Sequence, residues 1–408
     1  MRRSCTVADA AAVAAEVRAT VPAAASVAPE VAAIVEDVRL RGNAAVAEYE
    51  WRFGDGEWGR VPQERLDAAL DALDLEVRQA LKLAAANIAA VASAGLDPEA
   101  EVALDQGQSV RLRDIPVRRA AVYAPGGRAP YPSSVLMGAV TARAAGVDQV
   151  VVAAPSHPVI LAAAALCRAD EVYAMGGAQA IAALAHGTES IPRVDVLVGP
   201  GNLYVQEAKR QVSGLVGIDG FAGPSDLCVL LTGGADPGWA ARDLAAQAEH
   251  GPDSLVVAVS DDARLLAGVE ATGNGAGPDG PVLVEAADLD AALAFAEALA
   301  PEHLQLMGAA AEALAPRVRS AGCLFVGAHA GTAFGDYVAG SNHTLPTDGA
   351  ARFASGLNVR HFRRRMAEVR IPPQAAHALA PAGAAIARAE GFESHAASME
   401  ARRENPAR

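Results

Sequence analysis

The sequence predicts an α/β protein with two similar units, each a parallel β-sheet covered by helices. From about residue 118 onward, short apolar runs alternate with helical stretches, which is the pattern of repeated β–α units. The runs are continuously apolar, as strands buried on both faces of a parallel sheet are. A break near residue 225 divides them into two sets. The runs lie at 120–124, 150–154, 172–175, 194–198, 227–231, 255–259, 282–284, 304–307 and 323–326.

The same patterns divide the chain into four segments. Residues 1–117 are expected to form an N-terminal helical region that belongs to the first α/β domain, because alanine-rich periodic stretches fill them. Residues 118–225 and 226–355 are expected to be the two Rossmann-like domains, and 356–408 a helical tail with a helix at 382–401. The tail is too short to bury a core alone, so we expect it to dock on the body or on a neighbouring subunit.

Composition and charge exclude several classes of partner. The 408 residues are 52% hydrophobic and carry a formal net charge of −14, so nucleic acid and anionic membranes are not expected partners. The basic run 360–365 is interpreted as a solvated helix face or a subunit contact. No stretch reads as a membrane span, and the first residues lack the apolar core of a signal peptide. Four widely spaced cysteines fit a reducing compartment, and we expect a cytoplasmic protein.

Three glycine-rich turns in the first set each follow an apolar run and precede a helical stretch. They lie at 123–127, 176–179 and 199–202. Glycine lets the backbone approach a ligand, and helix N-termini bind anionic groups, so these turns fit a cofactor crevice as well as ordinary loops. In both units the crevice is expected at the carboxyl ends of the strands. The GxGxxG spacing at 275–280 follows a helix and precedes a strand, so it is interpreted as a surface turn.

A candidate metal pair stands near the end of a predicted helix in the second set. Gln247 and His250 are three residues apart and therefore share one helix face. An amide oxygen and an imidazole nitrogen can both bind zinc or a similar cation. The alternative is a histidine that interacts with the helix dipole beside a solvated glutamine.

A candidate acid–base pair, Glu302 and His303, enters the predicted strand at 304–307. A carboxylate and an imidazole can share proton transfer, one activating water and the other taking a hydroxyl proton. The alternative is a surface pair, because adjacent side chains usually diverge. Ser225, in the turn between the two units, fits either a helix cap or a ligand hydroxyl.

Further polar candidates lie near the end of the chain. Asp336 is a hard metal ligand and His343 an imidazole in the same glycine-rich loop. His395 follows Glu390 in the tail, where a lone histidine is usually solvated. Together, Gln247, His250, Asp336 and His395 would supply a four-ligand nitrogen and oxygen site.

These segments taken together resemble the histidinol dehydrogenase family over about 30–405. The resemblance implies a zinc- and NAD-dependent homodimer whose tail crosses to the partner, with two incomplete Rossmann-like domains. It also implies oxidation of L-histidinol to L-histidine through the aldehyde, the last two steps of histidine biosynthesis. The motifs that carry the resemblance lie at 123–137, 176–184, 199–202, 208–210, 222–225, 247–254, 301–304 and 335–346.

The resemblance also implies roles for residues of this chain. The zinc ligands would be Gln247, His250, Asp336 and, from the other subunit, His395. The acid–base pair would be Glu302 and His303. The further substrate contacts would be Ser225, His343 and Glu390, beside the zinc ligands and His303. The NAD contacts would be Tyr123, Gln179 and Asn202.

Small departures from the family leave alternatives open. The chain reads Pro-Ser-Asp at 224–226 where the family usually shows Pro-Ser-Glu, and its N-terminus is shorter. A paralogue that oxidises another small polyol or amino alcohol is therefore an alternative. A metallohydrolase with Glu302 activating a zinc-bound water is a second, although it would not need the three glycine-rich turns. A non-catalytic binding protein would not need an acid–base pair beside a metal.

Overall fold

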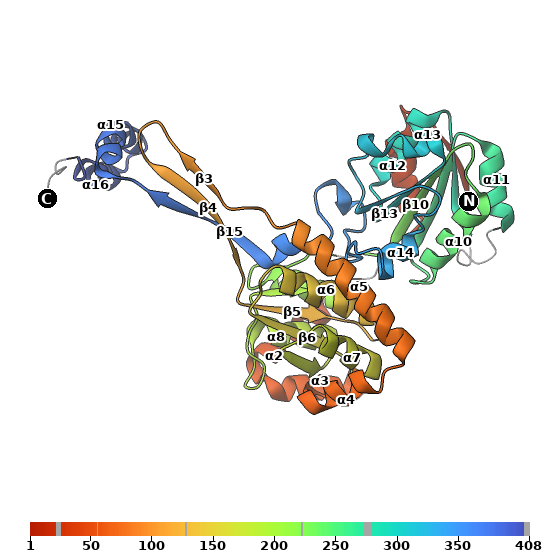
Figure 1. Ribbon diagram of the computed structural model, residues 1–408, viewed down its shortest axis with the longest axis horizontal. Coiled ribbons are helices and arrows are strands. Elements are labelled where there is room, and N and C mark those ends of the chain that lie inside the picture. The colour runs from red at the N-terminus through yellow and green to blue at the C-terminus, as the bar shows by residue number, and fades with distance from the viewer. Residues whose placement is uncertain (22–25, 55, 127–128, 222, 273–279, 404–408) are drawn as a thin grey trace. The chain divides into compact units, whose positions relative to one another are not determined.

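The computed structural model describes residues 1–21, 26–54, 56–126, 129–221, 223–272 and 280–403. These residues fall into two compact units (Figure 1). The first unit consists of Met1–Gly95 and Val117–Phe362, and the second of Leu96–Pro116 and Arg363–Arg408. The predicted α/β class with parallel-sheet domains is confirmed.

The first sheet has the order β2-β7-β6-β5-β8-β9 and is parallel except for β2, which runs antiparallel to β7. Its four longer strands match the predicted runs within two residues, whereas the two-residue strands β2 and β9 were not predicted. Counted along the chain from β5, the parallel strands have the Rossmann order 3-2-1-4-5. The strands are β2 (Gly59–Arg60), β5 (Arg119–Tyr123), β6 (Gln149–Ala154), β7 (Glu171–Ala174), β8 (Val196–Val198) and β9 (Gly217–Ile218).

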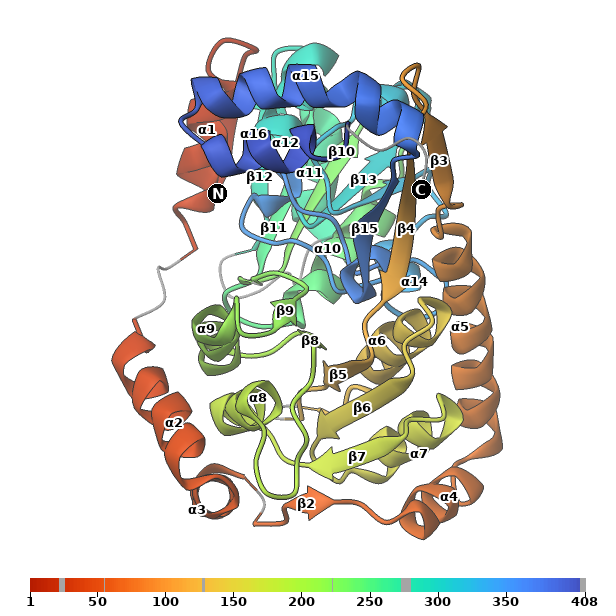
Figure 2. The same ribbon diagram turned by 90° about the vertical axis from the view of Figure 1, so that its left-hand side faces the viewer.

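Helices cover both faces of this sheet (Figure 2). Side chains alternate along each strand, so Ala120 and Val122 of β5 join one core while Ala121 and Tyr123 join the other. On the first face lie α4 (Gln63–Asp71), α5 (Leu75–Ala94), α6 (Pro132–Ala144) and α7 (Pro158–Leu166). On the second face lie α2 (Ala28–Arg41), α3 (Asn43–Phe53), α8 (Gly177–His186) and α9 (Leu203–Val212).

The second sheet has the order β1-β12-β11-β10-β13-β14, and all its pairs are parallel. Counted from β10, five of its strands repeat the order 3-2-1-4-5, and β1 takes the edge position that β2 holds in the first sheet. Strand β1 was not predicted, because only Cys5 of its four residues is buried and no apolar run marks it. The strands are β1 (Arg2–Cys5), β10 (Asp226–Leu231), β11 (Leu255–Ser260), β12 (Val282–Ala286), β13 (His303–Met307) and β14 (Cys323–Val326).

This sheet also separates two cores. Cys228 and Leu230 of β10 face the core shared with α1 and α12, and the alternate residues Leu227 and Val229 face the core shared with α10. The helices are α1 (Ala10–Arg18), α10 (Pro237–Ala248), α11 (Ala263–Thr272), α12 (Leu289–Leu299), α13 (Ala309–Glu312) and α14 (Thr332–Tyr337), with 3-10 turns at Ala315–Arg317, Ala350–Arg352 and Val359–Phe362.

The second unit corrects two expectations about the tail. The basic run is not one helix face, because its last three arginines open strand β15 (Arg363–Arg370), where Arg365 pairs with Asp114. The predicted tail helix is two helices, α15 (Pro373–Ala389), which contains Pro381, and α16 (Glu393–Glu400). Antiparallel β3 (Ala100–Ala103) and β4 (Ser109–Pro116) complete the sheet β15-β4-β3 (Figure 1).

No helix among the described residues is both long enough and apolar enough to cross a membrane. The GxGxxG spacing falls on residues 275–279, outside the described part of the chain, and ends at Gly280. The interpretation of that segment as a surface turn therefore stays a prediction.

Candidate active site

The candidate cofactor residues lie at the carboxyl ends of strands in the first sheet, as predicted. Tyr123 is the last residue of β5, and Asn202 caps α9 after β8 by accepting from Val205 N at 3.1 Å. Gln179 lies in the first turn of α8, which follows β7. The strand order reverses between β5 and β8, the point where open α/β sheets bind ligands.

A buried glutamate, Glu50 of α3, organises the turn before α8. Its Oε1 accepts from Gly176 N at 2.8 Å and from Gln179 Nε2 at 2.9 Å. Gly177 N donates to the Tyr123 hydroxyl at 3.1 Å. Burial, with the charge of Glu50, raises the pKa of Tyr123 to about 12, so its phenol stays protonated. Gly177 has φ +63°, and a Cβ there would lie 2.6 Å from Gln179 Oε1, so the turn requires glycine.

A buried ion pair holds the turn after β8. Lys209 Nζ donates to Gly199 O at 2.9 Å and pairs with Asp219, whose other oxygen accepts from Gly199 N at 2.7 Å. A Cβ at Gly199 would lie 2.0 Å from Tyr123 O. The two turns therefore meet closely at β5, with their polar groups already bound within the protein.

In the second sheet the candidate acid–base pair lies at the amino ends of the strands. Asp226 begins β10 and His303 begins the neighbouring strand β13. The expectation of a crevice at the carboxyl ends is wrong for this pair. The amino ends follow helix C-termini, where unpaired carbonyl groups favour cations rather than anions.

Glu302 and Asp226 bind each other's backbone. Glu302 N donates to Asp226 Oδ1 at 2.5 Å, and Asp226 N donates to Glu302 Oε2 at 3.1 Å. Cys323 N of β14 donates to Glu302 O at 2.8 Å, so backbone bonds fix the glutamate on two strands. Both carboxyl groups are buried, with Asp226 1% and Glu302 5% exposed.

Glu302 and His303 do not diverge, contrary to the usual behaviour of adjacent side chains. Glu302 Oε2 lies 3.7 Å from His303 Nδ1, and His303 Nε2 lies 3.7 Å from Asp336 Oδ1. Burial, partly offset by His303, raises the pKa of Glu302 to about 7, and the nearby charge of Asp226 adds to the rise. Burial opposes protonation of His303, but the contacts with Asp336 and Glu302 outweigh it and raise its pKa.

Asp336, in the last turn of α14, gathers three of the candidate histidines. Burial acts to raise its pKa, but contact with His303 and the charges of His343 and His250 outweigh burial and lower it. His343 Nδ1 lies 2.9 Å from Asp336 O, and its Nε2 lies 3.3 Å from the hydroxyl oxygen of Ser134 in α6.

The buried amide of Gln247 shows whether the residues of this site fit a metal ion. Its side chain is 1% exposed, yet neither Oε1 nor Nε2 has a hydrogen-bond partner. A buried amide without partners is costly, so its position indicates a missing ligand. Gln247 lies at the C-terminal end of α10, which packs against α14. Among the described residues no three His, Cys, Asp or Glu side chains form a metal cluster, so a site here needs the amide and a further donor.

The structure thus brings many of the candidate residues together, but not all. Ser225 joins the acid–base pair, because its hydroxyl hydrogen-bonds to Glu302. Glu390 and His395 belong to the second unit, at the end of α15 and in the first turn of α16, and both are exposed. Their assigned roles stay predictions.

Three partners of the site were missed by sequence reasoning. Glu50 and Arg18 stand on helices far along the chain from the motifs, where an isolated charge reads as a solvated residue. Asp219 follows the two-residue strand β9 that no pattern marked. For Asp226 a signal existed, since it is the position where the chain departs from the family pattern.

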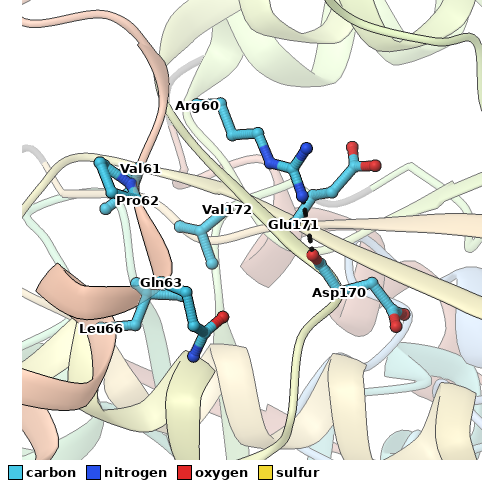
Figure 3. Close-up of a pocket in the computed structure, with 8 residues that line it drawn as sticks. All are labelled: Arg60, Val61, Pro62, Gln63, Leu66, Asp170, Glu171 and Val172. Carbon is cyan, nitrogen blue, oxygen red and sulfur yellow. Dashed lines mark hydrogen bonds between the residues drawn. The ribbon is translucent and has the colours of Figure 1, made fainter.

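A cavity of about 320 Å³ beside β2 and β7 lies apart from these residues (Figure 3). Arg60 donates across it to Asp170 O at 3.4 Å. None of the candidate site residues lines it. The lining residues are Arg60, Val61, Pro62, Gln63, Leu66, Asp170, Glu171 and Val172.

Comparisons with known proteins identify the family of the chain. A histidinol dehydrogenase of Rhizobium meliloti is 43% identical over 90% of this chain and 90% of its own length. One of Pseudomonas syringae pv. syringae is 41% identical over 91% and 88%. The crystal structure of histidinol dehydrogenase from Elizabethkingia anophelis superposes with a TM-score of 0.91 and 28% identity, covering 98% of this chain and 97% of that one. The profile of the family described as histidinol dehydrogenase matches residues 18–403, and the chain therefore belongs to this family.

Proposed function

We propose that this chain oxidises L-histidinol to L-histidine through the aldehyde, with zinc and NAD, in histidine biosynthesis. Membership of the family makes the chain an oxidoreductase. One observation supports the proposal most directly: the buried pair of Glu302 and His303 lies beside Asp336 at the amino end of β13. Relatives at 41–43% identity carry the name histidinol dehydrogenase.

The proposed metal ligands are Gln247, His250, Asp336 and the partner's His395. The unpartnered amide of Gln247 supports this set, because a bound cation would satisfy its oxygen. Bound there, zinc would hold the amine and imidazole of histidinol and fix its pose. Ser225, His343 and Glu390 are proposed as further substrate contacts.

The proposed NAD contacts are Tyr123, Gln179 and Asn202. NAD, when bound, would accept the electrons of each oxidation step. The turns at Gly176–Gly177 and Gly199 bring backbone close to this site, and α8 and α9 begin there, so their N-termini suit a pyrophosphate. Hydrogen bonds to Glu50 and Asp219 preorganise both turns.

His303 is the proposed base for the alcohol. An imidazole must be neutral to accept the hydroxyl proton, and Asp336 and Glu302 both favour its charged form in this structure. A cation at Asp336 would compete with the imidazolium for that carboxylate, so metal binding favours the neutral imidazole.

Glu302 is the proposed base that activates water for attack on the aldehyde. With a pKa raised to about 7 by burial, its carboxylate is basic enough to accept a proton from water yet ionised near neutral pH. The hydrogen bond from Asp226 N fixes the carboxylate, and the oxygen has little freedom to rotate away.

The proposal is tested with purified protein, zinc, NAD and histidinol, followed at the NADH absorbance band. The expected result is two NADH and one histidine per histidinol. Production of one NADH would show an alcohol dehydrogenase that stops at the aldehyde. Turnover only of another amino alcohol or polyol would support the paralogue, and hydrolysis without NAD would support the metallohydrolase.

A homodimer with exchanged tails is proposed with this function. The test mixes two variants, Glu302→Gln and His395→Ala, each expected to be inactive alone. If the partner's His395 completes each site, mixed dimers regain one working site, because one subunit keeps Glu302 and its partner keeps His395. No regained activity in proven mixed dimers would contradict tail exchange.

A further inference from the structure

A half-buried arginine from α1 reaches the carboxylate at the amino end of β10. Arg18 is the last residue of α1, and its Nη1 donates to Asp226 Oδ2 at 3.0 Å. Its Nη2 donates to Leu299 O at 2.5 Å, at the C-terminus of α12. The arginine is therefore fixed at both ends of its guanidinium, with its side chain 24% exposed.

We propose that Arg18 and Asp226 form a charge pair that tunes the proton affinity of Glu302, which makes both of them positioning residues of the acid–base pair. This inference rests on the role proposed for Glu302 as a base. It goes beyond that role because it traces the part of the base's strength that comes from Asp226 to α1, an element far along the chain from Glu302.

The geometry places two carboxylates side by side in a buried site. Asp226 and Glu302 accept hydrogen bonds from each other's backbone N–H, so their distance is set by the main chain rather than by flexible side chains. Two buried carboxylates held side by side in this way cannot easily both carry a negative charge. Burial raises the pKa of Asp226, and the charge of Arg18 opposes that rise and favours the ionised carboxylate, which in turn makes Glu302 hold its proton more tightly.

The other groups around the pair are few. His303 faces both carboxylates, and the Ser225 hydroxyl bonds to Glu302. Cys228, two residues along β10, is a thiol whose pKa burial raises, so it is uncharged. Arg18 has one other carboxylate within 4 Å, Asp348, at 3.6 Å, which is 73% exposed and weakly coupled.

Two single variants are therefore expected to shift the titration of Glu302 in the same direction. Asp226→Asn keeps an oxygen for Glu302 N but removes the charge. Arg18→Met leaves Asp226 without its counter-charge, so Asp226 takes up a proton near neutral pH. In both, Glu302 loses a negative neighbour, and the acid limb of kcat against pH moves down by about one pH unit.

The double variant Arg18→Met/Asp226→Asn sharpens the test. Since both changes act through one charge, its acid limb is expected to match that of Asp226→Asn, without an additive shift. The matched control is Arg2→Met, which removes an exposed pair with Glu270 and should leave the profile of the wild type unchanged. An unmoved or upward-shifted limb in either single variant, or additive shifts, would overturn the inference.

A second measurement keeps this test separate from the proposed activity. Melting temperatures of Arg18→Met and of the double variant are compared from about pH 4 to about pH 8. Protonated Asp226 is favoured in the folded single variant, so the double variant should be the more stable near pH 8, with the gap closing near pH 4. If the wild type forms no NADH, only the proposed function is contradicted. If the difference in melting temperature between the two variants does not depend on pH, this inference is contradicted.

Discussion

The two six-stranded sheets share one strand order but place their chemistry at opposite ends. In the first sheet the candidate residues lie at the carboxyl ends of β5, β7 and β8, and α8 and α9 begin after the last two. In the second sheet they lie at the start of β10 and β13, near the end of α10. Helix N-termini favour anions and helix C-termini favour cations. The proposed function therefore places the phosphates of NAD at one end of this fold and the cation at the other.

The two regions also differ in how their amides are satisfied. Gln179 donates to Glu50 within the protein, whereas the buried amide of Gln247 has no partner. The first region is a preformed surface that is complete without a ligand. The second is incomplete, which is the condition expected of a site that gains stability when an ion binds.

The largest effect is expected from the acid–base pair. His303→Asn should lower kcat by about 10²- to 10⁴-fold, because the imidazole that takes the hydroxyl proton is lost. Zinc content, measured by atomic absorption, should remain that of the wild type. The control is His157→Asn, since His157 only caps α7 and asparagine is also a good cap. Equal activity in the two variants would remove His303 from the mechanism.

The second prediction concerns the buried charge of Glu302. Because its pKa is raised to about 7, the folded protein holds this proton more tightly than the unfolded chain does. Ionisation therefore costs stability above the ordinary value of 4.5, reaching about 3 kcal/mol above neutral pH. Glu302→Gln should raise the melting temperature near pH 8 and leave it unchanged near pH 4. The same difference in melting temperature between Glu302→Gln and the wild type at both pH values would contradict the assigned pKa.

The third prediction compares the two amides directly. Without metal, Gln247→Leu should stabilise the protein by about 1–2 kcal/mol, because two unpaired polar atoms leave the interior. With zinc, the same variant should lose affinity for the ion, measured by calorimetric titration. Gln179→Leu is the matched variant and should destabilise the protein, because it removes one of the donors to the buried carboxylate of Glu50. A change of the same sign in both variants without metal would contradict the comparison of the two regions.

The smallest effect is expected at the cofactor turn. Glu50→Gln keeps an oxygen for both hydrogen bonds to the turn before α8 but removes the charge that strengthens them, so the KM for NAD should rise about tenfold while kcat changes little. Glu48→Gln in the same helix is the control, because Glu48 forms an exposed pair with Arg41. A fall in kcat without a change in KM would place Glu50 elsewhere in the mechanism.

Much of the fold could be predicted from the sequence, because buried parallel strands leave long apolar runs. The strands from β5 to β8 and from β10 to β14 appear where those runs lie. Strands β1 and β15 could not be predicted this way, since their residues are largely exposed or charged and their pairing partners are far along the chain.

For the site, local spacing predicted which residues matter but not how they meet. Adjacent side chains usually diverge, and the contact between Glu302 and His303 arises at the start of β13 beside β10, which local spacing did not predict. Arg18 and Glu50 act across more than a hundred residues of chain, a relation that no local pattern encodes. Local spacing likewise does not predict at which end of a sheet a site forms, because this depends on which helix ends carry side chains that can bind a ligand or transfer a proton.

The claim that the amino ends of β10 and β13 gather a cation is tested most directly by anomalous diffraction at the zinc edge. Crystals of the full chain grown with zinc should show one strong peak per chain, within bonding distance of Gln247 and Asp336. A peak at the glycine turns of the first sheet, or no peak at full zinc saturation, would contradict the account.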